Sequence, residues 1–263
     1  MTQISINKAS LVFLAGQLFF LCNSAMANNS SYITLSSQIA RKRQLEIVAN
    51  NTANINTVGF EQDKILLRPV NVVQNSKRSN SFVWPETTYR SGEQGPIKIT
   101  NRPTDVAIAG NGYFKLMTPK GPRYTLDGSM FISNQGVLVN STGYPFLSLD
   151  NAPIELPEQY QNLDITRQGL IFIDGDEIAQ LGVFEVDPKD SIIKEGNNLY
   201  STVGADRPME EFTIISGALK GSNVNSTLAM AQMVESQRSY GLITDLMSNV
   251  NDVETSAINK LTK

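Results

Sequence analysis

The sequence contains no histidine and a single cysteine, Cys22, among its 263 residues. Without histidine the chain cannot build a Ser-His-Asp triad, and it lacks the commonest general base and a principal metal ligand. One cysteine cannot form an intrachain disulfide or a thiolate metal cluster. Catalysis through Asp, Glu, Lys or Ser stays open to the chain, but these absences lead us to expect no enzyme activity, no cofactor and no metal site.

A strong excess of one charge is also absent. The 22 basic and 25 acidic residues give a net charge of −3, which offers no electrostatic attraction to nucleic acid or to an anionic membrane. The run Arg41-Lys42-Arg43 is short enough to be an ordinary solvated helix face. We therefore expect no nucleic-acid partner. The many Asn, Ser, Thr and Gln residues suit hydrogen-bonded contacts with other protein.

The apolar run near the start is too short to span a bilayer comfortably. It extends from Leu11 to Leu21, follows Lys8 and precedes Ala25-Met26-Ala27, which is the three-part form of a secretory signal. Residues 1–27 are therefore either a cleaved export signal or an extension ahead of a true start at Met26. In both cases we expect no membrane insertion of the mature body.

An N-terminal helix is predicted within residues 28–60, because apolar positions recur at three- and four-residue steps over 32–58. Gly59 then lies just beyond the predicted helix end, where a left-handed backbone is needed. Ile55 and Phe60 occupy the two offsets that touch in a Schellman ending. The sequence therefore predicts a long helix with a defined stop.

The last turns of this helix are unusually rich in asparagine. The residues concerned are Asn50, Asn51, Asn54 and Asn56. Four asparagines in place of alanines cost a helix about 2 kcal/mol in intrinsic propensity, and a polar residue in a helical seam fixes register and partner choice. We predict that these amides form hydrogen bonds to other helices.

A second helix is predicted over residues 226–263, after a connector at 216–225 that ends with Asn225 as N-cap. Apolar residues in its far half alternate at spacings of three and four, as in a heptad repeat. They are Ile243, Leu246, Val250, Val253 and Ala257. With an apolar seam on the helix at each end of the chain, the two helices are predicted to pack together.

The middle of the chain lacks helical periodicity. Residues 61–96 are expected to be an extended connector, and 97–215 an all-β domain of barrel or sandwich type, because short apolar runs alternate with turn signals. Asp174-Gly175 is typical of a two-residue hairpin turn. Gly110-Asn111-Gly112 lacks the third glycine of a dinucleotide-binding motif. The predicted fold class is α+β.

Three motifs in order resemble the flagellar rod and hook proteins. The stretch from Ala49 to Phe60 matches the form ANN-x-AN-x-NT-x-GF, and the segment from Gly110 to Leu147 matches the family's central series of glycine and aromatic residues. Near the end, Gly221 to Asn225 and Met233 to Tyr240 match GSNV-N and M-x-E-x-QR-x-Y. The resemblance assigns an assembly motif to Asn50, Asn51, Asn54, Asn56, Gly59, Phe60, Gln237, Arg238 and Tyr240.

The resemblance implies a structural subunit of the basal-body rod that lies in the periplasm, assembles axially with copies of itself and other rod proteins, and transmits torque. The terminal helices would pair as a coiled coil inside the rod, with the β domain outside. Export through the flagellar type III apparatus would favour Met26 as the start. The stretch 41–51 and the length from Met26 onward resemble proximal rod subunits most, and distal rod or hook subunits are the alternative. Glu61 departs from the family, in which a basic residue commonly follows the Gly-Phe pair. A competing class is a carbohydrate-binding or enzymatic β module.

Overall fold

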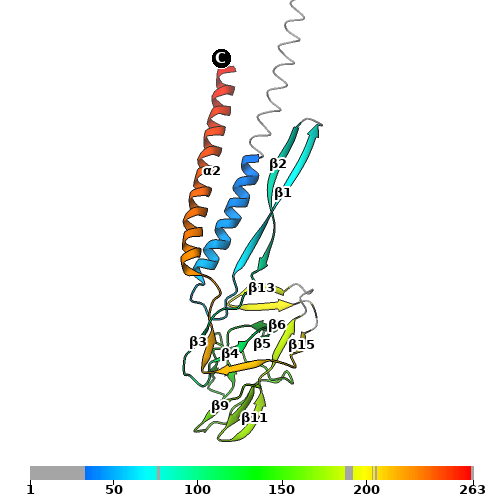
Figure 1. Ribbon diagram of the computed structural model, residues 1–263, viewed down its shortest axis with the longest axis vertical. Helices are drawn as coiled ribbons and strands as arrows, with labels where there is room; N and C mark the ends of the chain where they lie inside the picture. Colours follow the sequence, from blue (N-terminus) through cyan, green and yellow to red (C-terminus); the bar gives the residue numbers. More distant parts are fainter. Residues whose placement is uncertain (1–32, 76–77, 187–191, 203, 205, 262–263) are drawn as a thin grey trace, which may run out of the picture. The chain divides into compact units, whose positions relative to one another are not determined.

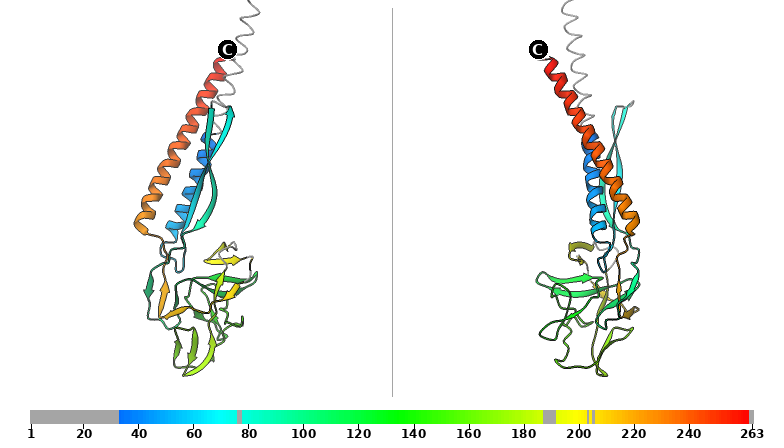
Figure 2. Two further views of the ribbon diagram at one scale, coloured as in Figure 1. Left: turned by 45° about the vertical axis from the view of Figure 1, so that its right-hand side comes forward. Right: turned by 90° about the vertical axis from the view of Figure 1, so that its left-hand side faces the viewer.

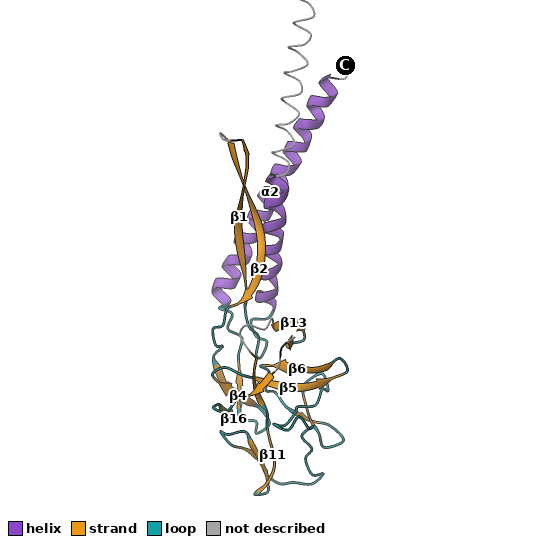
Figure 3. Cartoon of the chain, turned by 90° about the vertical axis from the view of Figure 1, so that its right-hand side faces the viewer, coloured by secondary structure: helices purple, strands orange, loops and turns teal. Residues whose placement is uncertain are grey.

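The computed structural model describes residues 33–75, 78–186, 192–202, 204 and 206–261. The signal-like segment 1–27 lies outside these residues. Helices occupy the two ends of the described chain and strands lie between them (Figure 3), so the α+β class is as predicted. The chain divides into two compact units, which are described in turn.

The first unit contains most of the N-terminal helix, which is described over residues 33–53. Ala40, Ile47 and Val48 are buried, whereas Leu35 and Ile39 on the same helix are exposed. The helix ends at residue 53, five residues before its predicted end at residue 58. The asparagine-rich residues that follow form turns instead of further helix.

A long hairpin also belongs to this unit (Figure 2). It consists of β1 (Asp63–Asn75) and β2 (Arg78–Arg90), each of 13 residues, which form a two-stranded sheet. The sequence suggested an extended connector over 61–96, because Pro69 and Pro85 interrupt its apolar runs. A two-stranded sheet has two open edges at which a proline removes no ladder hydrogen bond, so both prolines are compatible with long strands.

The C-terminal helix α2 (Ser226–Leu261) has 36 residues. At about 1.5 Å per residue it is about 54 Å long. It begins directly after Asn225, as the predicted N-cap requires. Gln38 Nε2 of the N-terminal helix donates a hydrogen bond to Thr244 Oγ1 of α2 at 3.5 Å.

The predicted coiled coil is wrong. A coiled-coil seam must be covered by a partner helix along its length, but two of its residues on α2, Leu246 and Val253, are 53% and 68% exposed, and Ala257 is exposed as well. A heptad spacing specifies that one stripe of a helix is apolar. It does not specify which surface covers that stripe.

The second unit holds the β domain. Its largest sheet has six strands in the order β13 (Ile192–Gly196), β14 (Leu199–Thr202), β6 (Gly121–Thr125), β5 (Tyr113–Thr118), β12 (Val183–Val186) and β15 (Asp206–Pro208). A three-stranded sheet contains β11 (Asp176–Gln180), β10 (Leu170–Ile173) and β9 (Leu163–Ile165). Three further pairs are β16 (Thr213–Ser216) with β4 (Val106–Ala109), β17 (Ala218–Lys220) with β3 (Ile97–Ile99), and β7 (Phe131–Ile132) with β8 (Leu138–Val139).

Most of these sheets contribute to one main apolar core, and a smaller cluster is formed by Tyr124, Phe184, Val186 and Tyr200. Fully buried members of the main core include Phe114, Leu116, Phe146 and Ile171, and the rings of Phe114 and Phe146 meet edge to face at 6.1 Å. Several of these antiparallel pairs join strands that are distant in sequence, such as β4 with β16 and β3 with β17 (Figure 1), which closes the β domain around its core.

The Asp174-Gly175 turn forms as predicted. Ile173 pairs with Asp176 across it, and both turn residues have positive φ, 52° and 100°, as a type I′ hairpin turn requires. The Asp174 carboxylate accepts hydrogen bonds from the backbone N–H groups of Gln161 and Asn162.

Candidate assembly joint

The asparagine-rich stretch ends the N-terminal helix through local hydrogen bonds. The Asn54 N–H donates to the Asn51 carbonyl at 3.2 Å, and the Thr57 N–H donates to the Asn54 carbonyl at the same distance. The Thr57 hydroxyl donates to Asn54 Oδ1 at 3.0 Å. Asn and Thr side chains compete with the helical ladder in this way, so these turns replace the last predicted turns of the helix.

Gly59 has the left-handed backbone that the sequence predicts, with φ of 68°, but it does not close a Schellman motif. Its N–H donates to the Lys220 carbonyl at 2.7 Å. A Cβ atom at this position would lie 2.6 Å from the backbone carbon of Leu126. The glycine is needed because two segments distant in sequence approach its backbone closely.

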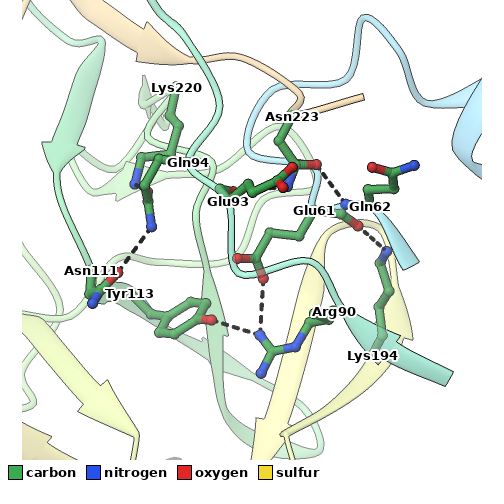
Figure 4. A network of polar contacts seen from close by, with 10 residues as sticks. All are labelled: Glu61, Gln62, Arg90, Glu93, Gln94, Asn111, Tyr113, Lys194, Lys220 and Asn223. Atoms are coloured by element: carbon green, nitrogen blue, oxygen red, sulfur yellow. Dashed lines mark hydrogen bonds and ion pairs between the residues drawn. The ribbon is translucent and has the colours of Figure 1, made fainter. Parts of the chain in front are cut away.

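Three passages of the chain meet at this point, and we call them the joint: residues 59–62, 90–96 and 220–223 (Figure 4). Asn223 links all three, because its N–H donates to the Phe60 carbonyl, its Oδ1 accepts from the Gln62 N–H at 2.7 Å, and its Nδ2 donates to the Glu93 carbonyl at 2.8 Å. The side-chain amide of Asn223 therefore connects the three passages, and main-chain hydrogen bonds add to this, among them those from the Ser91 N–H to the Gln62 carbonyl and from the Gly221 N–H to the Pro96 carbonyl.

Charged side chains reinforce the joint. The buried Glu61 carboxylate accepts a hydrogen bond from Arg90 Nη1 at 3.0 Å, and the same nitrogen donates to the Tyr113 hydroxyl at 2.6 Å. Lys194 Nζ donates to the Glu61 carbonyl at 3.0 Å and lies 3.8 Å from the centre of the Phe60 ring. The Glu61 side chain is thus a buried anion paired with Arg90, while its main-chain carbonyl accepts from Lys194.

A further cation of the joint is Lys220, which is only 3% exposed. Its Nζ donates to Gln94 Oε1 at 2.6 Å and to the Gly110 carbonyl at 2.8 Å. Burial lowers the pKa of Lys220, and the charge of Glu61 partly opposes that shift. Neutral acceptors satisfy this lysine, so it adds directed hydrogen bonds to the joint.

Tyr113 should make the stability of the joint depend on alkaline pH. Burial, followed by the charge of Glu61, raises the pKa of Tyr113 above its ordinary value of 10.0, although Arg90 opposes the shift. The unfolded state therefore ionises first, so the stability from Tyr113 is complete below pH 10.0 and is lost as the pH rises through the raised pKa. We expect Tyr113→Phe to lower the free energy of unfolding by about 1 kcal/mol near neutral pH.

Urea unfolding at about pH 8 and about pH 10.5 measures this effect. The difference between the wild type and Tyr113→Phe should shrink at the higher pH. A difference that stays constant would show that the hydroxyl contributes only a neutral hydrogen bond.

The predicted site residues do not all meet. Gly59 and Phe60 lie in the joint. The buried Asn51 lies in the last turn of the N-terminal helix, and the half-buried Asn54 lies in the turn that follows it. The remaining members lie at the surface or on α2: Asn50 and Asn56 are exposed, as are Gln237 and Arg238, and Tyr240 is half-buried.

Sequence reasoning missed the partners that complete the joint. Arg90, Tyr113, Lys194 and Lys220 come from four distant segments and share no local spacing. The one available signal was Glu61, an acidic residue at a position where the resemblance implies a basic one. Nothing in the sequence around Arg90 indicates that it pairs with Glu61.

Among the described residues, no group of three or more His, Cys, Asp or Glu side chains is arranged to hold a metal ion. None of the described helices combines the length and apolar character needed to cross a membrane.

A β domain fastened by a charged joint, together with a long helix whose large apolar side chains are exposed, defines a structural subunit that assembles with other chains. Three family models match in order. Residues 32–60 match the flagella basal body rod protein, 107–173 the flagellar hook protein FlgE/F/G D1 domain, and 215–260 the flagellar basal body rod FlgEFG protein C-terminal region.

Individual relatives match over nearly the whole chain. The flagellar basal-body rod protein FlgF of Caulobacter vibrioides is 31% identical over 90% of this chain and 99% of its own length. FlgF of Mesorhizobium japonicum is 30% identical over 89% and 98%, and the rod protein FlgG of Bacillus subtilis is 26% identical over 88% and 98%. The chain therefore belongs to the flagellar basal-body rod protein family, in which it is more similar to these FlgF proteins than to this FlgG. It is a structural subunit of the basal-body rod.

Proposed function

We propose that this subunit occupies the proximal part of the periplasmic rod, where it assembles with copies of itself and with other rod proteins and transmits torque. The observation that carries the proposal is the joint. It fastens three passages of the chain through main-chain hydrogen bonds and the Glu61–Arg90 ion pair at 3.0 Å. Every connection that leaves the β domain for the helices or the hairpin passes through it, so a force on one connection is shared among all three.

Assembly would use surfaces that the single chain leaves exposed. Leu228, Leu242, Leu246 and Val253 lie on one face of α2 and are each more than half exposed. Burying such side chains against other subunits provides the main driving force for association. Repetition of one heterologous contact produces an open helical polymer. The exposed members of the motif, Asn50, Asn56, Gln237 and Arg238, would supply directed polar contacts at these interfaces.

Two further parts of the proposal concern export and chemistry. The type III apparatus of the flagellum would export the chain, and this stays a prediction that secretion assays in an export-deficient strain can test. We infer a mechanical subunit without enzyme activity, because its relatives are rod proteins and its assigned residues serve structural contacts.

Leu242→Glu tests assembly separately from folding. Leu242 is 71% exposed, so the substitution should change the free energy of unfolding of the isolated chain by no more than about 0.5 kcal/mol. A buried carboxylate at a subunit interface is strongly unfavourable, so a strain that carries this variant should lose swimming and yield basal bodies with incomplete rods.

Ser248→Glu is the matched control, because six residues at about 100° each place it on another face of the helix. The control should retain more motility than Leu242→Glu. Full swimming of Leu242→Glu would refute the assignment of this side chain to an interface.

A further inference from the structure

A buried lysine lies on β5, one of the two central strands of the six-stranded sheet. Lys115 of β5 is 7% exposed. Its Nζ lies 2.5 Å from Asp206 Oδ2 on β15 and 2.7 Å from Asn151 Oδ1 in the turn that follows Ser148. A buried ammonium has three N–H donors, and a carboxylate that pairs with it satisfies only part of them. Here the amine also touches the oxygen of a carboxamide.

The surroundings of Lys115 restrict its movement and the access of water. Its Nζ lies 4.7 Å from the centre of the Phe184 ring and 6.0 Å from that of Tyr124. The Tyr124 hydroxyl hydrogen-bonds to Asp206, and burial together with that carboxylate raises the pKa of Tyr124, so the phenol stays a proton donor. The rings of Phe184 and Tyr124 therefore flank the Lys115 ammonium, which also forms hydrogen bonds to Asp206 and Asn151.

Asn151 is fixed from the other side. Its N–H donates to the Ser148 carbonyl at 3.0 Å, and its φ of 62° is left-handed. The N–H of the next residue, Ala152, donates to Ser148 Oγ at 3.3 Å. The turn thus presents the carboxamide to the lysine, with the carbonyl carbon one bond beyond the 2.7 Å contact.

From this geometry we propose that Lys115 and Asn151 join in the folded chain by an amide bond between Nζ and Cγ, with Asp206 as the proton relay. Nζ is a nucleophile in contact with both an electrophilic carboxamide and an acid, and such placement converts a slow bimolecular reaction into an intramolecular one. The site takes no external ligand, since both reactants belong to the chain.

The reaction balances without an oxidant or other co-reactant. A proton passes from the Lys115 ammonium to Asp206, which leaves a neutral amine and a carboxylic acid. The amine attacks Cγ of Asn151 to form the N–C bond, while Asp206 protonates the carbonyl oxygen. Asp206 then carries a proton from Nζ to the amide nitrogen, the Cγ–Nδ2 bond breaks, the carbonyl reforms, and ammonia leaves and is protonated to ammonium.

Such a bond would tie β5 covalently to the 148–152 turn, 36 residues further along the chain. It would protect the centre of the β domain from forced unfolding. The bond can form only after folding, because residues from three segments must first come together.

Intact mass measurement of the purified, folded chain tests the proposal. We expect a mass about 17 Da below that of the sequence, the loss of one ammonia. A protease digest should contain one branched peptide that joins the segments around Lys115 and Asn151. A chain kept in denaturant should retain its full mass.

Variants separate this bond from other reactions. A succinimide at Asn111-Gly112 would also remove one ammonia, but only the proposed bond is abolished by Lys115→Arg, which keeps the ion pair and removes the nucleophile. Asn151→Asp should lose about 18 Da, one water, in place of ammonia. Asp206→Asn should slow formation at least tenfold.

Full mass in the folded wild type after prolonged incubation, or the same loss in Lys115→Arg, would overturn the proposal. In the first case Lys115 is a buried ion-paired lysine and no more. In the second case the lost ammonia comes from elsewhere in the chain.

Discussion

Replacing Gly59 by alanine should destabilise the β domain by about 4 kcal/mol, the sum of a left-handed backbone and a steric overlap. The added Cβ would lie 2.6 Å from the backbone carbon of Leu126 and 2.7 Å from the backbone nitrogen of Asp127. Backbone atoms inside a packed domain cannot move aside as the end of a flexible side chain can. The hydrogen bond from Gly59 to the Lys220 carbonyl should be lost with the displacement.

Gly92→Ala provides a matched control. Gly92 has almost the same φ, 67°, but a Cβ there would have nothing within 4 Å. Gly92→Ala should lower the free energy of unfolding only by the cost of a left-handed backbone, about 1–2 kcal/mol. Urea unfolding followed by circular dichroism measures both variants, with an unchanged slope showing that stability alone has changed. Equal losses at the two positions would mean that the approach of residues 126–127 does not constrain Gly59.

Charge reversal at Glu61 should have the second large effect. Glu61→Lys places an ammonium beside Arg90 and Lys194 in a site where the glutamate is 9% exposed. Removing one partner of a buried pair costs about 3 kcal/mol, and like charges add to that loss. We expect the midpoint of unfolding to fall by more than it does for Glu61→Gln, which keeps the shape and removes only the charge.

The double variant Glu61→Lys, Arg90→Glu restores one opposite-charge pair and serves as the test of mechanism. It should recover part of the lost stability, and the non-additivity measures the coupling between the two side chains. If the double variant is no more stable than the sum of the single changes predicts, the 3.0 Å contact between Glu61 and Arg90 contributes little.

Local features of the fold could be predicted because their causes are local. The Asp174-Gly175 turn forms where its chemistry places it. The left-handed conformation of Gly59 was foreseen as well. Its reason was not, since the sequence pointed to a helix cap and the structure shows a close approach by residues 126–127.

The joint shows where prediction from sequence stopped. The Asn54–Thr57 turn could have been anticipated from the tendency of both side chains to bond their own backbone. The pairing of Glu61 with Arg90, 29 residues away, could not, because nothing in the spacing of two charges reveals that the chain doubles back between them. The chain returns from Glu61 to Arg90 through the hairpin of β1 and β2.

The sequence by itself determined that this chain is an α+β protein of the flagellar rod family, since helix periodicity, turn chemistry and three ordered motifs are all carried by neighbouring residues. Only the tertiary structure decided that the terminal helices do not share a coiled-coil seam and that Gly59, Glu61 and Asn223 fasten three passages of the chain together. The physical reason is the same in each case. The sequence shows that a residue is apolar or charged and therefore requires burial or an opposite charge. Only the fold determines which distant residue provides that contact.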